Sequence, residues 1–371
     1  MDWERKVFLA CIGLLLAVGL LMVHSASMTA RPTEFEQIYV GRQAMFIVLG
    51  LFLAVLASHV PVSQWQRWAP WLFAFTIVLL IAVLIPGVGS RVNGARRWLR
   101  QGALSFQPAE LAKLAVPLMV ASLAFRHPAA LRRWWGTISL IWPVLLVAPL
   151  VLLEPDLGTT VFLLGGAGLT LALCGWPTRY FLVAGLGIIP TLVGLLILKP
   201  YQRERLMGFV RIWTDWESAP YQIKQSMVAL GAGGINGVGL GRGEQKLSFL
   251  PEANTDFVVA VLGEELGLIG TLGLLTLWAC VYLVGLRLLS RLSLRSFEFV
   301  VGFVLLTQLM AQALLNVAVV TAMVPPKGIS HPLVSYGGSN LVVSLLAIGI
   351  FWSFLQNAPS SPPSRSGESG R

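Results

Sequence analysis

The residues of this sequence that could do acid–base chemistry stand at the edges of long apolar runs. Asp256 ends the segment Pro251–Asp256 and directly precedes one such run. We expect it in the first turn of the following helix, where the helix dipole favours the charged carboxylate and lowers its pKa. A general base works best with a pKa near the operating pH, so partial burial or a second carboxylate would have to offset the dipole. Asp256 is therefore the candidate catalytic base and a candidate metal ligand.

Two charges, Glu110 and Lys113, lie inside an apolar run three residues apart, which puts both side chains on one helix face. If this run spans a membrane, each ionisable group costs about 2.5–3.5 kcal/mol on insertion scales and normally faces a partner or a cavity. The pair is either a self-neutralising contact that fixes helix packing or part of a polar cavity near the outer face. We predict the cavity, with both residues binding substrate and Glu110 a second candidate metal ligand.

Two further segments combine carboxylates and cations in ways suited to phosphate binding. Glu154 and Asp156 stand in the tight connection EPDLGT, where Asp156 with Thr159 could cap the next helix. The short segment 87–107 holds four arginines, and guanidinium groups bind phosphate and pyrophosphate well. A solvated loop or contacts with anionic lipid headgroups are the alternatives for these arginines. We predict that Asp156 and the neighbouring pair Arg96 and Arg97 bind substrate.

Glycine-rich and irregular segments complete the candidate set. Gly231–Gly243 contains seven glycines in thirteen residues, and it either brings backbone N–H groups to a phosphate or forms a flexible re-entrant loop. The segment 327–340 precedes the last apolar run and could place irregular backbone in a protein-lined cavity. From it we predict Lys327 and Ser335 as substrate-binding residues.

The elements that must position these residues follow from composition. Of the 371 residues, 56% are apolar and only 12% are charged, less than half the usual charged share of a soluble domain. A spanning helix takes roughly 20 mostly apolar residues, so the chain can fill about ten spans with little left for a soluble core. A soluble enzyme, a disordered chain and a nucleic-acid-binding domain are all excluded. We predict an all-α polytopic membrane protein, a bundle of about ten helices expected at 7–24, 43–58, 69–86, 108–125, 137–153, 159–175, 180–198, 256–286, 297–321 and 339–356.

With the N-terminus inside, raw counts of basic residues (12 inside, 14 outside) do not decide the orientation, so the expectation rests on the short loops. With the N-terminus inside, the short loops 126–136 and 287–296 are cytoplasmic and purely basic, as the positive-inside rule expects. The first run is too long for a signal-peptide core, so we interpret it as an uncleaved span. Residues 1–356 then form one membrane domain with a large outer loop, 199–255, before the eighth helix. Residues 357–371 form a disordered tail, and both termini are cytoplasmic.

Several of these segments together resemble one family. The stretches GARRWLRQGALSFQPAELAKL, EPDLGT, YQIKQSMVALGAGGINGVGLGRGEQKLSFLPEANTDFVVAVLGEELGLIG and PPKGISHPLVSYGGSN resemble the SEDS family of cell-wall proteins, which includes FtsW and RodA. The resemblance runs from the first span to about Gln356 and is closer to the division protein than to the elongation protein. The chain departs from the family pattern at Glu154, where Gln is usual, at Asn254, where His is usual, and at His331, in a commonly apolar position.

The resemblance implies an inverting peptidoglycan glycosyltransferase that polymerises lipid II at the outer face of the bacterial cytoplasmic membrane, with undecaprenyl pyrophosphate as leaving group. It implies a divalent metal ion, Mg²⁺ or Mn²⁺, and a class B penicillin-binding protein (an FtsI-like transpeptidase) as partner, with other division proteins and membrane lipid but no nucleic acid. The family's essential Asp matches Asp256. Its other important polar positions match Glu110, Lys113, Asp156 and Arg97.

Three alternatives stay open at this stage. A transporter that flips lipid II would also place polar residues in a membrane bundle. An elongation-type polymerase would do the same chemistry in another complex. A scaffold that only recruits the crosslinking partner would leave Asp256 dispensable.

Overall fold

The computed structural model describes residues 2–27, 34–92, 95–101, 104–247 and 249–356. Within these ranges, nine helices are long and apolar enough to cross a membrane, and the 17-residue α6 is a tenth apolar helix. The bundle of ten helices predicted from the sequence is confirmed, and the predicted tail 357–371 lies outside the described residues. The ten helices are α1 (Asp2–Ala26), α2 (Glu34–Ser58), α3 (Val62–Leu84), α4 (Pro108–Arg126), α5 (Trp134–Leu153), α6 (Leu157–Leu173), α7 (Thr178–Leu198), α10 (Val258–Leu289), α11 (Phe297–Val320) and α12 (Gly338–Gln356).

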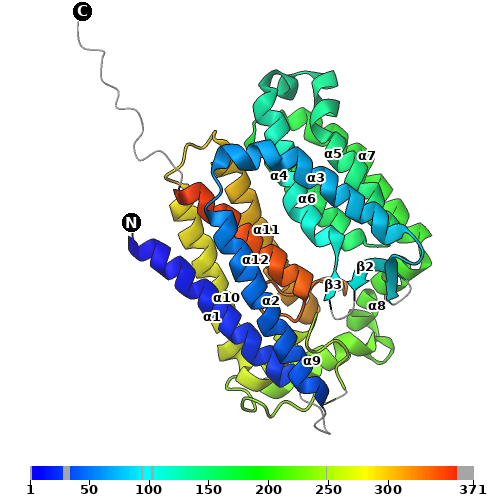
Figure 1. The fold of residues 1–371 in the computed structure, drawn as a ribbon. Helices are drawn as coiled ribbons and strands as arrows, with labels where there is room; N and C mark the ends of the chain where they lie inside the picture. Colours follow the sequence, from blue (N-terminus) through cyan, green and yellow to red (C-terminus); the bar gives the residue numbers. More distant parts are fainter. Residues whose placement is uncertain (1, 28–33, 93–94, 102–103, 248, 357–371) are drawn as a thin grey trace, which may run out of the picture.

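The helices pack in two groups that meet at α4 (Figure 1). One hydrophobic core joins α1, α2, α10, α11 and α12, and a second joins α3, α4, α5 and α6. Leu114 and Leu118 of α4 belong to the first core, whereas Val116 and Val120 belong to the second. Because α4 is packed from both sides, 83% of its apolar window is buried. The charges that it carries are therefore held inside the protein.

The helix α7 is the opposite case. None of its apolar window is buried, and in Figure 1 it lies at the edge of the molecule. Its apolar side chains therefore face the hydrocarbon of a bilayer or the cavity described below.

The arginine-rich segment between α3 and α4 folds as a small antiparallel sheet, which the sequence reading did not anticipate. Its strands are β1 (Gly89–Val92), β2 (Ala95–Gln101) and β3 (Leu104–Phe106), in the order β1-β2-β3. Side chains alternate between the two faces of a strand. Arg97 and Arg96 therefore point to opposite faces of β2, and Arg96 lies opposite Arg91 of β1.

The predicted outer loop 199–255 contains two helices and a turn of 3₁₀ helix. These are α8 (Pro200–Thr214), η2 (Trp216–Ser218) and α9 (Tyr221–Gly233). A second 3₁₀ helix, η1 (Pro128–Arg132), lies in the basic loop between α4 and α5.

A break at Gly267 interrupts α10, where the backbone has φ 66° and ψ −161°. The glycine-rich segment after α9 supplies partners for the backbone groups that the break frees. The Val238 N–H donates to the Glu264 carbonyl (3.0 Å), and the Leu268 N–H donates to the Gly234 carbonyl (2.9 Å). This segment is thus re-entrant backbone that pairs with α10, which favours the second of the two interpretations of its glycines.

The two adjacent glutamates of α10 fasten the outer segment further. Glu265 is buried and pairs with the buried Lys246 at 2.6 Å, and it also accepts from the Ser25 hydroxyl of α1 at 2.6 Å. The Glu264 carboxylate accepts from the backbone N–H groups of Glu244 and Gln245 at 2.8 and 3.2 Å. Both adjacent glutamates therefore have basic or polar partners inside the protein.

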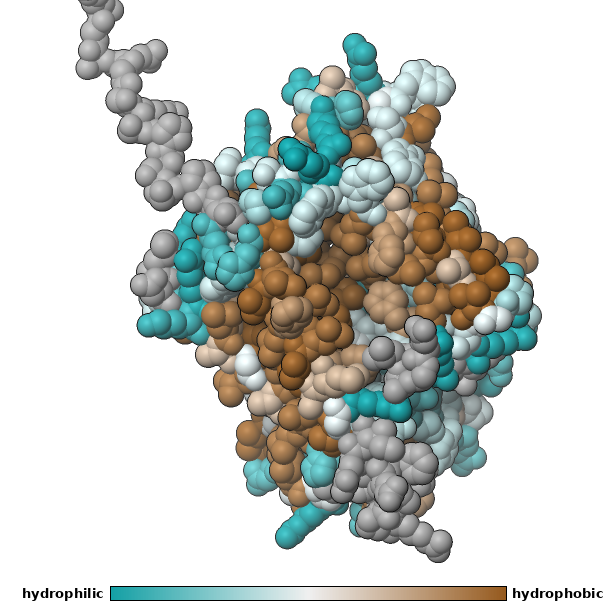
Figure 2. Space-filling model, viewed as in Figure 1, coloured by the Kyte–Doolittle hydropathy of each residue, from teal (hydrophilic) through white to brown (hydrophobic). Residues whose placement is uncertain are grey.

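The surface agrees with a membrane-spanning bundle. Figure 2 shows a broad apolar area across the middle of this face, with hydrophilic side chains gathered above and below it. Exposed large apolar side chains are spread over the spanning helices, for example Phe52 on α2, Phe75 on α3 and Leu186 on α7.

Candidate active site

Asp256 lies in a turn just before α10, which begins at Val258, two residues later than expected. Its side chain is half-buried, and the Ser330 hydroxyl donates to its Oδ1 at 3.4 Å. Burial raises the pKa of Asp256 to about 7, and the charge of Glu252 adds to the rise. The Ser330 hydrogen bond and the guanidinium group of Arg205 act in the opposite direction. The structure thus supplies the burial and the second carboxylate that a general base at this position requires.

Arg97 and Asp156 lie together beside this turn. The Arg97 guanidinium donates to the carbonyl groups of Glu154 (2.8 Å) and Pro155 (2.6 Å), and its Nη1 lies 3.9 Å from Asp156 Oδ2. Asp156 caps α6, as predicted, because its Oδ1 accepts from the Thr159 N–H at 3.0 Å. The positive charge of Arg97 also acts against the rise in the pKa of Asp256.

Glu154 has different surroundings from its neighbour Asp156. Its side chain is fully buried, and both carboxylate oxygens lack a hydrogen-bond partner among the described residues. Burial, and then the charge of Asp156, raise its pKa to about 9. Glu154 is therefore a neutral carboxylic acid at pH 7, behind the face that Arg97 and Asp156 present.

Lys327 and Arg205 bring further positive charge to the same place. A Cβ atom built at Gly158 would lie 3.4 Å from Lys327 Cδ and 3.5 Å from Asp156 Oδ1, so these two side chains flank Gly158. Burial lowers the pKa of Lys327, whereas Asp156 acts to raise it. The Arg205 Nη1 donates to the Pro326 carbonyl at 3.4 Å.

A cavity of about 550 Å³ opens beside these cations, between α6, α7, α8 and α11. Its outer end is lined by the polar side chains of Gln202, Arg205 and Lys327. Its remaining walls are almost entirely apolar and include Val161, Phe162, Leu169, Leu192, Leu196, Ala311 and Leu315. A site with cations at its rim and an apolar interior fits a lipid that carries an anionic headgroup.

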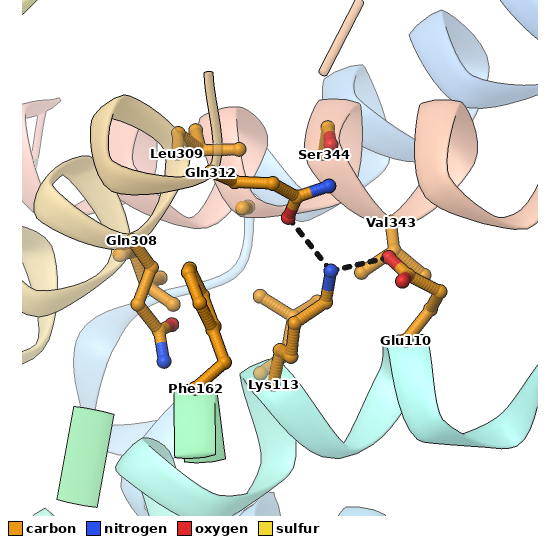
Figure 3. Close-up of a pocket in the computed structure, with 11 residues that line it drawn as sticks. Glu110, Lys113, Phe162, Gln308, Leu309, Gln312, Val343 and Ser344 are labelled. Carbon is orange, nitrogen blue, oxygen red and sulfur yellow. Dashed lines mark hydrogen bonds and ion pairs between the residues drawn. The ribbon is translucent and has the colours of Figure 1, made fainter. Parts of the chain in front are cut away.

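The Glu110–Lys113 pair forms a second, closed polar cluster (Figure 3). The two side chains are buried and 2.6 Å apart, Lys113 donates to Gln312 Oε1 at 2.7 Å, and the Asn340 amide donates to Glu110 at 3.0 Å. Lys113 also lies over the Phe162 ring, 5.6 Å from its centroid. The cavity here is about 20 Å³, roughly the room for one water. This geometry favours a positioning role for the pair over direct contact with a substrate.

The structure brings Asp256, Asp156, Arg97 and Lys327 together but leaves Arg96 and Ser335, like the Glu110–Lys113 pair, apart from them. Arg96 points to the other face of β2. Ser335 is buried, and its hydroxyl accepts from the His331 N–H at 2.8 Å, which favours a structural role.

Four residues of the site were not predicted from the sequence: Arg205, Gln312, Asn316 and Ser330. The two amides have a sequence signal, since Gln308, Gln312 and Asn316 are spaced by four in an otherwise apolar helix and so share one face. Arg205 and Ser330 carry no such signal, because only the tertiary structure brings α8 and the segment before α12 to Asp256.

No three His, Cys, Asp or Glu side chains gather to hold a metal ion within the part of the chain that the structure describes. Glu110 is already engaged by Lys113 and Asn340. Of the two candidate metal ligands, Asp256 is the one with a partly accessible carboxylate next to the cavity.

Fold and site together define a polytopic membrane protein with a carboxylate, several cations and a lipid-sized apolar cavity. The family described as "Cell cycle protein" (FtsW/RodA/SpoVE) matches residues 5–358, and the chain belongs to this family. It is 40% identical to a "Probable peptidoglycan glycosyltransferase FtsW" of Coxiella burnetii, over 94% of this chain and 95% of the relative. A protein of the same description from Legionella pneumophila is 37% identical over 94% of this chain and 89% of its own length.

Two solved structures share the fold. One, described as "Structural coordination of polymerization and crosslinking by a peptidoglycan synthase complex", has a TM-score of 0.76 at 29% identity and covers 94% of this chain and 96% of its own. The other is the rod shape determining protein RodA of Thermus thermophilus, with a TM-score of 0.69 at 26% identity, covering 95% of this chain and 97% of its own. The family predicted from the sequence motifs is thereby confirmed.

Proposed function

We propose that this chain is a division-type peptidoglycan glycosyltransferase that polymerises lipid II at the outer face of the bacterial cytoplasmic membrane. The names of its relatives support this activity, as does membership of the family. The observation that carries the proposal is the juxtaposition of Asp256 and Arg97 with Arg205 and Lys327, the two cations that line the apolar cavity.

The reaction joins the 4-hydroxyl of an acceptor sugar to C1 of a donor sugar. Asp256 takes the proton of the acceptor hydroxyl as its oxygen attacks, and the bond from C1 to the pyrophosphate breaks with inversion. Undecaprenyl pyrophosphate leaves as an anion, so it needs positive charge rather than a protonated acid. Lys327 and Arg205 supply that charge, and the cavity behind them holds the polyisoprenyl tail.

The donor set suits a divalent cation bound partly by substrate. Mg²⁺ commonly binds through one or two carboxylates together with substrate phosphates, without a complete protein cage. Asp256 offers one such carboxylate beside the proposed pyrophosphate position. A bound cation would neutralise charge on the leaving group.

The partner and the orientation follow the same proposal. A class B penicillin-binding protein with transpeptidase activity would crosslink the strands, which is consistent with the likeness to a chain from a peptidoglycan synthase complex. Both termini would be cytoplasmic, and the basic loops 126–136 and 287–296 support this orientation.

The test is glycan synthesis by the purified protein with its penicillin-binding partner on labelled lipid II. We expect polymer from the wild type and loss of about 10²–10⁴-fold in rate for Asp256→Asn, the usual effect of removing a general base. Unchanged membrane insertion and partner binding are the controls. Full polymerisation by Asp256→Asn would refute the assignment of the base, and lipid II flipping without polymer would favour the transporter.

A further inference from the structure

Two amide side chains on α11, Gln312 and Asn316, connect parts of the site that are far apart in the sequence. They lie four residues apart, so they share one face of the helix. Both are buried. A buried amide is costly unless its hydrogen bonds are made. Nδ2 of Asn316 and Nε2 of Gln312 bond to backbone outside α11, whereas Oδ1 of Asn316 has no partner among the described residues.

Asn316 ties the base to the segment before α12. Its Nδ2 donates to the Asp256 carbonyl at 2.8 Å and to the Ile329 carbonyl at 2.7 Å. Asn316 therefore links the two backbones, which are also joined where the Tyr336 N–H donates to the Asn254 carbonyl at 2.8 Å.

Gln312 connects the same segment to the buried charges of α4. Its Oε1 accepts from Lys113 at 2.7 Å (Figure 3), and its Nε2 donates to the Ser330 carbonyl at 2.9 Å. The Ser330 hydroxyl in turn donates to Asp256 Oδ1 at 3.4 Å. A continuous path runs from the Glu110–Lys113 pair through Gln312 and Ser330 to the carboxylate of the base.

The segment that these amides hold passes very close to the base and carries a cation of the site. A Cβ atom at Gly328 would lie 2.9 Å from Asp256 Oδ2, so the backbone approaches the carboxylate directly. The preceding residue, Lys327, lines the outer end of the apolar cavity. A small shift of this segment would change the separation between the base and Lys327.

We infer that Gln312 and Asn316 are positioning residues that hold Asp256 and Lys327 at the separation that glycosyl transfer requires. The inference rests on the proposed function. Neither amide lines the apolar cavity, so their loss affects the chemical step more than lipid binding. A misplacement of about 1 Å in a catalytic group can lower the rate about 10²-fold.

The test uses the full chain in complex with its penicillin-binding partner and labelled lipid II. Gln312→Glu and Asn316→Asp keep the size of each side chain but remove the N–H donors. We expect kcat to fall by about 10-fold or more while KM stays within about 3-fold. Thr321→Val is the matched control, because the Thr321 hydroxyl bonds only to the carbonyls of Val317 and Ala318 in its own helix. We expect it to keep wild-type kcat.

Hydrogen exchange gives a second readout that needs no turnover. The backbone amides of residues 328–331 should exchange faster in both amide variants, and those of residues 234–241 should be unchanged. If an amide variant fails to fold, Ser330→Ala tests the Gln312 path, because it removes only the hydroxyl that reaches Asp256; we expect it to lower kcat with KM retained.

Wild-type kcat in a folded amide variant or in Ser330→Ala, or a loss confined to KM, would overturn the inference. The two failures are distinguishable. Absence of polymer from the wild type and from Thr321→Val would count against the proposed function, and hydrogen exchange would still decide whether the amides hold the segment. Loss of kcat only in the amide variants would support the inference itself.

Discussion

At the scale of single residues, three neighbouring carboxylates have very different surroundings. Asp156 accepts two hydrogen bonds from Thr159 and faces Arg97. Glu154, two residues earlier, is buried without hydrogen-bond partners for its carboxylate among the described residues. Asp256 lies between these extremes, half-buried with one weak hydroxyl contact. Environment, more than residue type, sets the role of each.

The pH dependence of polymerisation should follow the ionisation of the Asp256 carboxyl group. Its pKa is raised to about 7, and a general base must be unprotonated, so we expect kcat/KM to fall below about pH 7 by tenfold per pH unit. Glu252→Gln should shift this fall in kcat/KM to lower pH, because the charge of Glu252 raises the pKa of Asp256. The pH profiles of the wild type and of Glu252→Gln are measured as polymerisation rates on labelled lipid II between pH 5 and 9. An identical fall in kcat/KM in the two proteins would show that Glu252 does not affect the pKa of Asp256.

The stability of the protein should depend on Glu154. Its folded-state pKa of about 9 exceeds the ordinary value of 4.5, so between these pH values the unfolded carboxyl ionises while the folded one stays protonated. The free energy of unfolding then falls with rising pH, by up to about 1.4 kcal/mol per unit. Glu154→Gln should therefore melt at a higher temperature than the wild type at pH 8, with a smaller difference at pH 5. The exposed Glu244→Gln serves as control, and an equal difference at both pH values would contradict the assignment.

At the scale of elements, α10 is built around its break. The helix runs for 32 residues, but Gly267 interrupts its hydrogen bonding, and the backbone after α9 replaces the lost partners. Close approach of two backbones requires glycine at the contact. A Cβ atom at Gly237 would lie 2.1 Å from the Glu265 carbonyl oxygen, and the φ of Gly237 is 79°.

Alanine substitutions should show which glycines are needed for the close approach of the two backbones and which are not. We expect Gly237→Ala to lower the melting temperature strongly or to prevent folding, because it combines a backbone clash with an unfavourable φ. Gly231→Ala, in α9, meets nothing within 4 Å and should be neutral or stabilising by up to about 1 kcal/mol. Thermal unfolding in detergent compares the two, and equal effects would show that the close approach is unimportant.

At the scale of the whole molecule, one buried cluster joins α1, α10 and the segment that carries Lys246. Lys246 donates to Glu265, to the Ser25 hydroxyl (2.8 Å) and to the Gly241 carbonyl (3.0 Å). Because Asp256 lies between Lys246 and α10 in the chain, this cluster fixes both ends of the segment that carries the base.

Breaking the cluster on one side should destabilise the protein. Lys246→Met leaves the buried carboxylate of Glu265 unpaired, which costs about 3–5 kcal/mol. Adding Glu265→Gln removes the stranded charge and should recover part of the loss. The exposed Lys6→Met is the control and should change stability by less than about 0.5 kcal/mol. A single and a double variant of equal stability would show that the charge pair does not act as a unit.

The sequence by itself determined the ten apolar helices, because segments of 17 to 32 mostly apolar residues leave few alternatives to a spanning helix. It also predicted Asp256 and Asp156 as site residues and, through long motifs, the family. The capping of α6 by Asp156 is local in the chain, which is why it could be predicted.

Only the tertiary structure decided which of these groups meet. The small sheet turns Arg97 toward Asp156 and Arg96 away from it, because strand register is set by pairing between segments. Glu110 and Lys113 look like cavity residues in the sequence, but packing of α4 between two cores leaves them room for about one water. Arg205, Ser330, Gln312 and Asn316 reach the site from three separate segments. Hydrophobic periodicity constrains each helix alone, whereas the site depends on contacts between helices that are far apart in the chain.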